Sequence, residues 1–164
     1  MGIRHQGSGG STSRVFHAQG DPGYLPCVSA SSESATLAIF LHSGAYDRLH
    51  QGLSIAASGA ALGRRVDVYF FWWALERLLT DRLDEPDFSE REDVAVRFEA
   101  RGLPTLRSLL THLRDSDQVT LVACTGSLAA LGLTPADAEG HVDTLLGWTS
   151  ILTRTAGLTD RFYL

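Results

Sequence analysis

The chain of 164 residues contains no lysine, so its 14 basic residues are all arginines, against 19 acidic residues. The formal net charge is −5, and the arginines form no basic run. A clustered basic patch is the usual electrostatic signature of nucleic-acid binding. We therefore expect no nucleic-acid partner.

Long hydrophobic stretches are also missing. The densest apolar run, 66–75, is interrupted by Asp67 and is far shorter than the roughly 20 residues that a transmembrane helix needs. The first residues lack the charged-then-apolar order of a signal peptide. These absences predict a soluble, cytoplasmic protein with no membrane partner.

Cysteine is scarce, with only Cys27 and Cys124 present, which is too few for a disulfide framework. In a reducing compartment we expect each to remain a thiol. No CxxC pair, P-loop or GxGxxG motif occurs, and the histidines show no metal-ligand spacing with cysteine or carboxylate. We therefore expect neither a metal nor an organic cofactor.

Composition changes near residue 35. Residues 1–34 include GSGGSTS and DPGYLP, which are typical of linkers and turns and predict a flexible N-terminal extension. Cys27 lies in this extension, where we expect it to have no role. Residues 35–164 have the length and composition of one globular domain.

Segments with strand-like and helix-like patterns alternate within this domain. The segments expected to be strands are 36–44, 64–73, 93–102, 119–124 and 160–164. The segments expected to be helical are 46–62, 74–79, 103–114, 125–131, 134–140 and 142–156. Such alternation is typical of a parallel sheet wrapped by helices. We predict an α/β fold with a flavodoxin-like open parallel sheet of four or five strands and helices on both faces.

Single residues refine these boundaries. Ser43 is expected to be the N-cap of the first helix, and Gly63 to follow its last turn. Pro104 is expected in the first turn of a later helix. The segment 80–92 is charged and contains proline, which predicts an exposed excursion.

Polar and reactive residues follow two of the predicted strands. They are His42, Ser43 and Gly44 after the first strand, and Cys124, Thr125, Gly126 and Ser127 after the later one. In open α/β sheets, sites form beyond the carboxyl ends of the strands, where the strand order reverses. In a flavodoxin-like order these two strands are neighbours, so we expect His42 and Cys124 to share one crevice.

Cys124 is the candidate for a reactive group because it directly precedes a predicted helix. The N–H groups and dipole at a helix N-terminus favour a thiolate, the form that attacks or carries sulfur. Gly126 would allow close backbone approach, and Thr125 or Ser127 would donate a hydrogen bond. The alternative is that Cys124 is a small buried core residue, as free cysteines often are.

His42, Trp72 and Trp73 also have two readings each. His42 would orient or protonate a group bound near Cys124, or would be a partly buried histidine bonded to the backbone. The two tryptophans are expected to end the second strand and to face opposite ways. One would pack in the core, and the other, which we take to be Trp73, would cover the crevice or an oligomer contact.

Three segments in this order resemble the DsrE/DsrF/DsrH-like family. They are LAIFLHSGAYDRLHQGLSIAASGAALGRRVDVYFFWWALERLL, GLPTLRSLLTHLRDSDQVTLVACTGSLAALGL and the terminal DRFYL, and the resemblance covers 36–164. It implies a flavodoxin-like fold, small oligomers and a cytoplasmic sulfur relay. The family's cysteine after the later strand matches Cys124 and would carry sulfur as a persulfide between donor and acceptor proteins.

The leading hypothesis is therefore a sulfur carrier, or sulfurtransferase-like subunit, in which His42, Ser43 and Gly44 shape the crevice. Where the most similar subgroup has a Met-Ser-Met-like sequence after the cysteine, this chain has a more polar Thr-Gly-Ser. Some family members lack the cysteine, so the second hypothesis is a binding or assembly subunit with an inert Cys124. A thiol peroxidase is weaker because no proline-threonine-cysteine arrangement is present.

Overall fold

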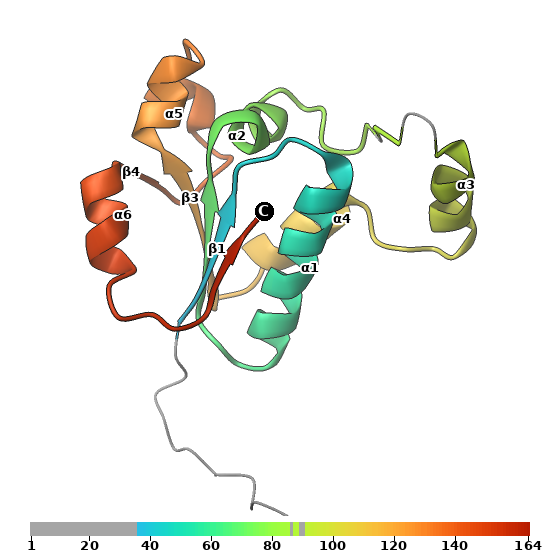
Figure 1. Cartoon of the computed structure of the whole chain (residues 1–164), viewed down its shortest axis with the longest axis horizontal. Coiled ribbons are helices and arrows are strands. Elements are labelled where there is room, and N and C mark those ends of the chain that lie inside the picture. The colour runs from blue at the N-terminus through green and yellow to red at the C-terminus, as the bar shows by residue number, and fades with distance from the viewer. Residues whose placement is uncertain (1–35, 86, 89–90) are drawn as a thin grey trace, which may run out of the picture. The chain divides into compact units, whose positions relative to one another are not determined.

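The computed structural model describes residues 36–164 except 86, 89 and 90, so the expected extension 1–34 and Cys27 lie outside the described residues. The strands are β1 (Leu37–Leu41), β2 (Val66–Phe70), β3 (Val119–Cys124), β4 (Thr144–Leu146) and β5 (Arg161–Tyr163). They form one all-parallel sheet in the order β4-β3-β2-β1-β5 (Figure 1).

Helices cover both faces of this sheet (Figure 1). They are α1 (Tyr46–Ala61), α2 (Trp72–Leu79), α3 (Glu92–Ala100), α4 (Leu106–Arg114), α5 (Thr125–Ala130), the 3₁₀ turn η1 (Pro135–Ala138) and α6 (Trp148–Arg154). On one face, strand side chains such as Ile39 and Val68 pack with α1, α2, α4 and α5. On the other face, Phe40 and Val122 pack with Ile151 of α6. The predicted α/β fold, with a parallel sheet between helices, is confirmed.

The strand order differs from the expected one in a way that matters for the site. β2 pairs with both β1 and β3, and β1 has β5 as its second neighbour. The expectation that the first strand and the cysteine-bearing strand lie side by side is therefore wrong. Strand order depends on contacts between distant segments, and the local patterns that locate strands carry little information about it.

The first helix matches its prediction, except at the cap. α1 ends before Leu62 and Gly63, and Gly63 has a φ of +74°, as expected for the residue after a helix. The N-cap is Ala45, which makes no side-chain cap bond. Ser43 accepts a hydrogen bond from the Ala45 N–H at 3.1 Å, so it orders the turn before the helix and is not its cap.

Two segments adopt a different element from the one expected. The residues 93–102, expected to form an edge strand, belong largely to α3, where Asp93 and Arg97 form an ion pair at the i, i+4 spacing of a helix. The residues 142–156, expected to be one helix, divide into β4 and α6 at Gly147. β4 has only three half-buried residues, too few for a period-two pattern.

Boundaries around α2 and α4 also differ from those expected. Trp72 and Trp73 begin α2 and do not end the second strand. Pro104 precedes the N-cap Thr105, whose side chain accepts from the Ser108 N–H at 3.2 Å, so it lies before the first turn of α4. Within the excursion 80–92, Leu83 is buried, and the segment is therefore not wholly exposed.

An ion pair between a buried carboxylate and a partly exposed arginine links α6 to the sheet. Asp67, in β2, accepts two hydrogen bonds from Arg154 of α6, each at 2.7 Å, and one from the Tyr69 hydroxyl at 3.1 Å. Burial, followed by the charge of Asp67, raises the pKa of Tyr69, so its hydroxyl stays protonated as a donor. The carboxylate is therefore fully engaged, and Asp67 is a structural residue in the core.

Candidate functional site

The carboxyl ends of β1, β2 and β3 carry the predicted site. Leu41 is in register with Phe70, and Phe70 with Ala123, so the next residues, His42, Phe71 and Cys124, lie at one level. Adjacent strands are about 4.8 Å apart, which puts the backbones of β1 and β3 roughly 10 Å apart. β2 therefore separates the two halves of the predicted crevice.

Phe71 fills the space between them. Its side chain is fully buried and stacks on His42, with ring centroids 4.5 Å apart, and on Trp148, with centroids 4.8 Å apart. His42 thus contacts Phe71. The crevice that His42 and Cys124 were expected to share is occupied by this ring. Sequence reasoning missed Phe71 because it continues the apolar run of its strand.

Cys124 ends β3 and directly precedes α5. Its side chain is 1% exposed and belongs to the cluster on the α6 face, together with Phe71, Val122 and Ile151. It is a free thiol and occupies the N-cap position without a side-chain cap bond. The position after the strand is as predicted, while the burial agrees with the alternative of a core cysteine.

The three residues after Cys124 differ in their exposure. Thr125 and Gly126 are exposed, whereas Ser127 is buried. A Cβ atom placed on Gly126 would lie 3.7 Å from the Cys124 Sγ, and one on Gly147 would lie 3.4 Å from the Thr125 Oγ1. Glycine at 126 therefore leaves no side chain from that position next to the sulfur, and glycine at 147 leaves none next to Thr125.

His42 is half-buried beyond the end of β1, and burial lowers its pKa. Its imidazole is therefore biased toward the neutral form, since desolvation penalises the charged one. A neutral ring stacked on Phe71 fits the role of a packing residue. The structure brings His42 together with Ser43 and Gly44, and not with Cys124.

The two adjacent tryptophans are both exposed, Trp72 by 46% and Trp73 by 57%, so the expectation that one packs inside is wrong. Trp72 has a φ of +43°, in the left-handed region that bulky residues rarely adopt. This conformation turns the chain sharply from β2 into α2. A Cβ on Gly44 would lie 3.0 Å from the Trp73 carbonyl oxygen, so this close approach requires glycine at position 44.

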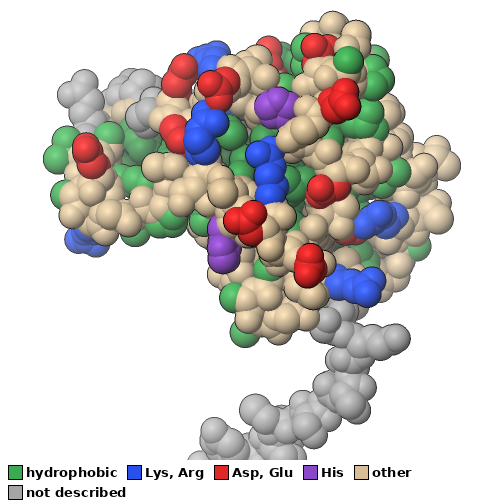
Figure 2. Space-filling view, turned by 180° about the vertical axis from the view of Figure 1, so that it is seen from behind, with side chains coloured by type: hydrophobic (Ala, Val, Ile, Leu, Met, Phe, Trp, Pro, Cys, Tyr) green, Lys and Arg blue, Asp and Glu red, His purple; other side chains and the backbone are tan. Residues whose placement is uncertain are grey.

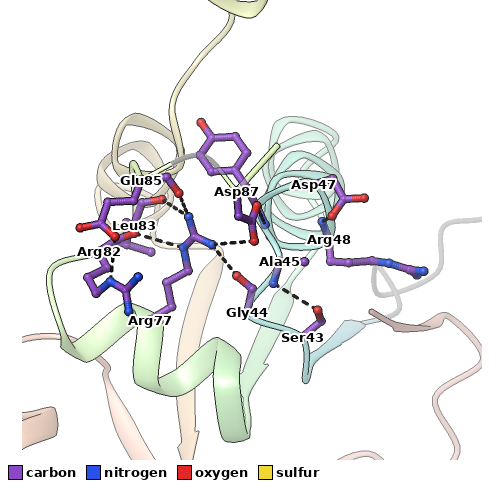
Figure 3. Close-up of polar contacts among 11 residues, drawn as sticks. Ser43, Gly44, Ala45, Asp47, Arg48, Arg77, Arg82, Leu83, Glu85 and Asp87 are labelled. Atoms are coloured by element: carbon purple, nitrogen blue, oxygen red, sulfur yellow. Dashed lines mark hydrogen bonds and ion pairs between the residues drawn. The ribbon is translucent and has the colours of Figure 1, made fainter. Parts of the chain in front are cut away.

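Arg77 of α2 makes several hydrogen bonds next to this turn (Figure 3). Its side chain is 11% exposed. The guanidinium donates to the Gly44 carbonyl at 2.6 Å, to Asp87 at 3.3 Å and to the carbonyls of Arg82, Leu83 and Glu85. These bonds tie the turn after β1 to the segment that follows α2.

Asp87 extends this network to a third element. Its second carboxylate oxygen accepts from the Tyr46 N–H, at the start of α1, at 2.9 Å. A hollow of about 270 Å³ lies beside the network and is lined in part by Gly44, Trp73 and Arg77. In the sequence, Arg77 is an unremarkable charged residue in an amphipathic helix, so no local signal identifies its role.

A metal centre and a membrane-crossing helix are two further possibilities for the part of the chain that is described. Within it, no group of three or more histidine, cysteine or carboxylate side chains is placed to hold a metal ion. Within the same residues, no helix combines the length and apolar character needed to cross a membrane.

Comparison with known proteins gives little guidance. No family model and no curated protein matches the chain. Among solved structures, it is similar to the protein of unknown function MTH1491 from Methanobacterium thermoautotrophicum, with 17% identity and a TM-score of 0.48, covering 79% of this chain and 99% of that chain. Such a likeness shows neither a family nor a function, so the resemblance to DsrE-like proteins stays a prediction.

Proposed function

We propose that the protein carries sulfane sulfur as a persulfide on Cys124. The observation that carries the proposal is the position of this free thiol, at the carboxyl end of a central strand and directly before a helix. This is the edge at which open α/β sheets place their sites. Glycine at 126 supports the proposal because it places no side chain against the sulfur.

The reaction is a thiol–persulfide exchange. The Cys124 thiolate attacks the outer sulfur of a donor persulfide, R–S–SH, forming a new S–S bond while the donor S–S bond breaks. The donor leaves as the thiolate R–S⁻, so charge and atoms balance and no external oxidant is needed. Transfer to an acceptor thiolate is the same exchange in the opposite direction.

The burial of Cys124 sets a condition on this proposal. At 1% exposure the sulfur meets a donor only after residues around it move aside. In the proposal this opening accompanies docking of the donor or acceptor protein. The protein would work in the cytoplasm, where a thiol stays reduced, and as a homo-oligomer.

The test is to incubate reduced protein with glutathione persulfide and to measure the intact mass and the modified peptide. A Cys27→Ser variant isolates Cys124, and a Cys124→Ser variant provides the matched control. We expect a gain of one sulfur atom on Cys124 that a thiol reductant removes. No gain in the folded Cys27→Ser protein, at any donor concentration that leaves it folded, would contradict the proposal.

The burial of Cys124 favours a second candidate function, a binding or assembly subunit in which the thiol is inert. The exposed rings of Trp72, Trp73 and Trp148 lie at the same edge of the sheet and suit a contact with another protein. Alkylation separates the two functions: an inert core thiol labels only as fast as the protein unfolds, whereas a carrier thiol labels faster.

A further inference from the structure

A second pocket, of about 480 Å³, lies between α1, α3 and the start of α4. Its volume falls within the usual range for small-molecule sites. Most of its lining is apolar and consists of Tyr46, Phe88, Ala95, Val96, Phe98 and Leu103. None of these residues belongs to the Cys124 site, so the pocket raises a separate question.

Aromatic rings build the wall of this pocket. The ring of Tyr46 meets those of Phe88 and Phe98 edge to face, at centroid distances of 5.3 and 5.8 Å. Val96 and Leu103 remain 67% and 44% exposed, so the apolar surface is not covered by the chain itself. Figure 2 shows hydrophobic side chains gathered at the left, on and beside α3. The pocket therefore offers rings and aliphatic groups to a ligand.

The charged residues of the lining are both acidic, Asp84 and Glu99. Asp84 accepts from the Arg107 N–H at 3.0 Å and pairs with the Arg107 Nε at 3.4 Å, so its charge is largely compensated. Within the described residues Glu99 is exposed and has no ion-pair partner, while the nearby Arg97 pairs with Asp93. One carboxylate at the pocket is thus available to a cation.

The start of α4, which would otherwise attract an anion, is already satisfied. The Ser108 N–H donates to Thr105 and the Arg107 N–H to Asp84. Burial and, next, the charge of Asp84 raise the pKa of the nearby Tyr46, so its hydroxyl stays neutral. With two of its first N–H groups already bonded, this turn offers little to an anion, which would also meet two carboxylates.

We propose that this pocket binds a small organic cation, with an apolar, aromatic body and a primary ammonium group. The body packs against the rings of Tyr46, Phe88 and Phe98, and the ammonium group lies next to the Glu99 carboxylate. An ammonium group near aromatic faces gains a further cation–π attraction. This binding site is independent of sulfur transfer at Cys124.

Three probes that share a phenyl ring and differ in charge test the proposal: 2-phenylethylammonium, 2-phenylethanol and 3-phenylpropanoate. Binding is measured on the full chain by titration calorimetry and by NMR shifts. We expect the ammonium compound to bind most tightly and the carboxylate most weakly. Equal binding of all three, or no measurable binding of the ammonium compound, would overturn the proposal.

Variants locate the binding. Glu99→Gln should weaken binding of the ammonium compound about two- to fivefold, which is the usual effect of losing an exposed ion pair. Binding of the alcohol should stay unchanged. Glu139→Gln removes the same charge outside this pocket and should change neither. Ala95→Phe should fill the pocket and abolish binding of all three probes, with circular dichroism confirming that it folds. Ammonium binding that Glu99→Gln leaves unchanged rejects the assigned site, even where Ala95→Phe fails to fold.

Discussion

Gly126 lies next to the Cys124 sulfur and places no side chain against it. A persulfide adds a second sulfur about 2.05 Å from the first. A methyl group at 126 would already contact Sγ at 3.7 Å, so Gly126→Ala should lower persulfide loading about fivefold or more. Mass spectrometry of the loaded protein measures this change.

The same substitution should not harm the fold. Gly126 lies in α5, where alanine is the better helix former by up to about 1 kcal/mol, and no atom other than Sγ lies near the new methyl group. The melting temperature should therefore stay the same or rise. Unchanged loading of a stable Gly126→Ala protein would show that the second sulfur does not occupy this space.

His42 gives a prediction about pH. Burial lowers its pKa in the folded state below the value of about 6.5 that it has when unfolded. As the pH falls through 6.5, the unfolded state therefore binds a proton at this residue before the folded state does. The free energy of unfolding then decreases. Urea unfolding between pH 7.5 and 5 should show the decline.

The variant His42→Phe keeps an aromatic ring against Phe71 but cannot titrate, so its stability should fall less over the same pH range. His112→Asn is the matched control because His112 is exposed on α4, and it should follow the wild type. A wild-type pH profile that His42→Phe leaves unchanged would assign the decline to other groups.

Among the connections between elements, the contacts of Arg77 join three parts of the fold. Arg77→Met should lower the free energy of unfolding by about 2–3 kcal/mol, because Asp87 loses one of its donors and the Gly44 and Glu85 carbonyls lose the bonds that Arg77 makes. Limited proteolysis should then cut between 80 and 88 more readily than in the wild type.

Arg82→Gln serves as the control for this prediction. Arg82 is exposed, and among the described residues its ion pair is with nearby Glu85 at 2.7 Å, so its loss should not measurably change stability or cleavage. Equal effects of the two substitutions would mean that the network around Arg77 does not hold the segment after α2.

Elements with a strong pattern of their own could be predicted from the sequence. β1 is a fully buried apolar run, and α1 has apolar residues at helical spacing and a glycine after its end. α3 could not be recognised, because Val94, Val96 and Phe98 alternate as they would in a strand. The edges of the sheet are formed by β4 and β5, and most of the segment 93–102 forms a helix and not an edge strand.

Across the whole molecule, stability should be uneven. All residues of β1 and β2 are buried, whereas all residues of β5 are exposed, and the α3 side chains whose burial is described are at most half-buried. Amide hydrogen exchange should therefore be slowest in β1 and β2 and fast in α3 and β5. Protection in α3 equal to that of β2 would contradict this expectation.

The candidate site was predictable only in part, because it depends on the arrangement of the whole sheet. The position of Cys124 after a strand follows from its own neighbours in the sequence. Its distance from His42 depends on β2 lying between β1 and β3, and its burial depends on the contact with α6. These are long-range contacts, which a single sequence does not display.

The strand order also bears on how the chain is made. During synthesis, β1 to β4 emerge in the same order in which they pair, but the second neighbour of β1 is β5, which emerges after the other four described strands. Until then, the open edge of β1 presents unpaired backbone groups flanked by fully buried apolar side chains. The open edge of β1 is therefore most prone to aggregation in the interval before β5 pairs with it.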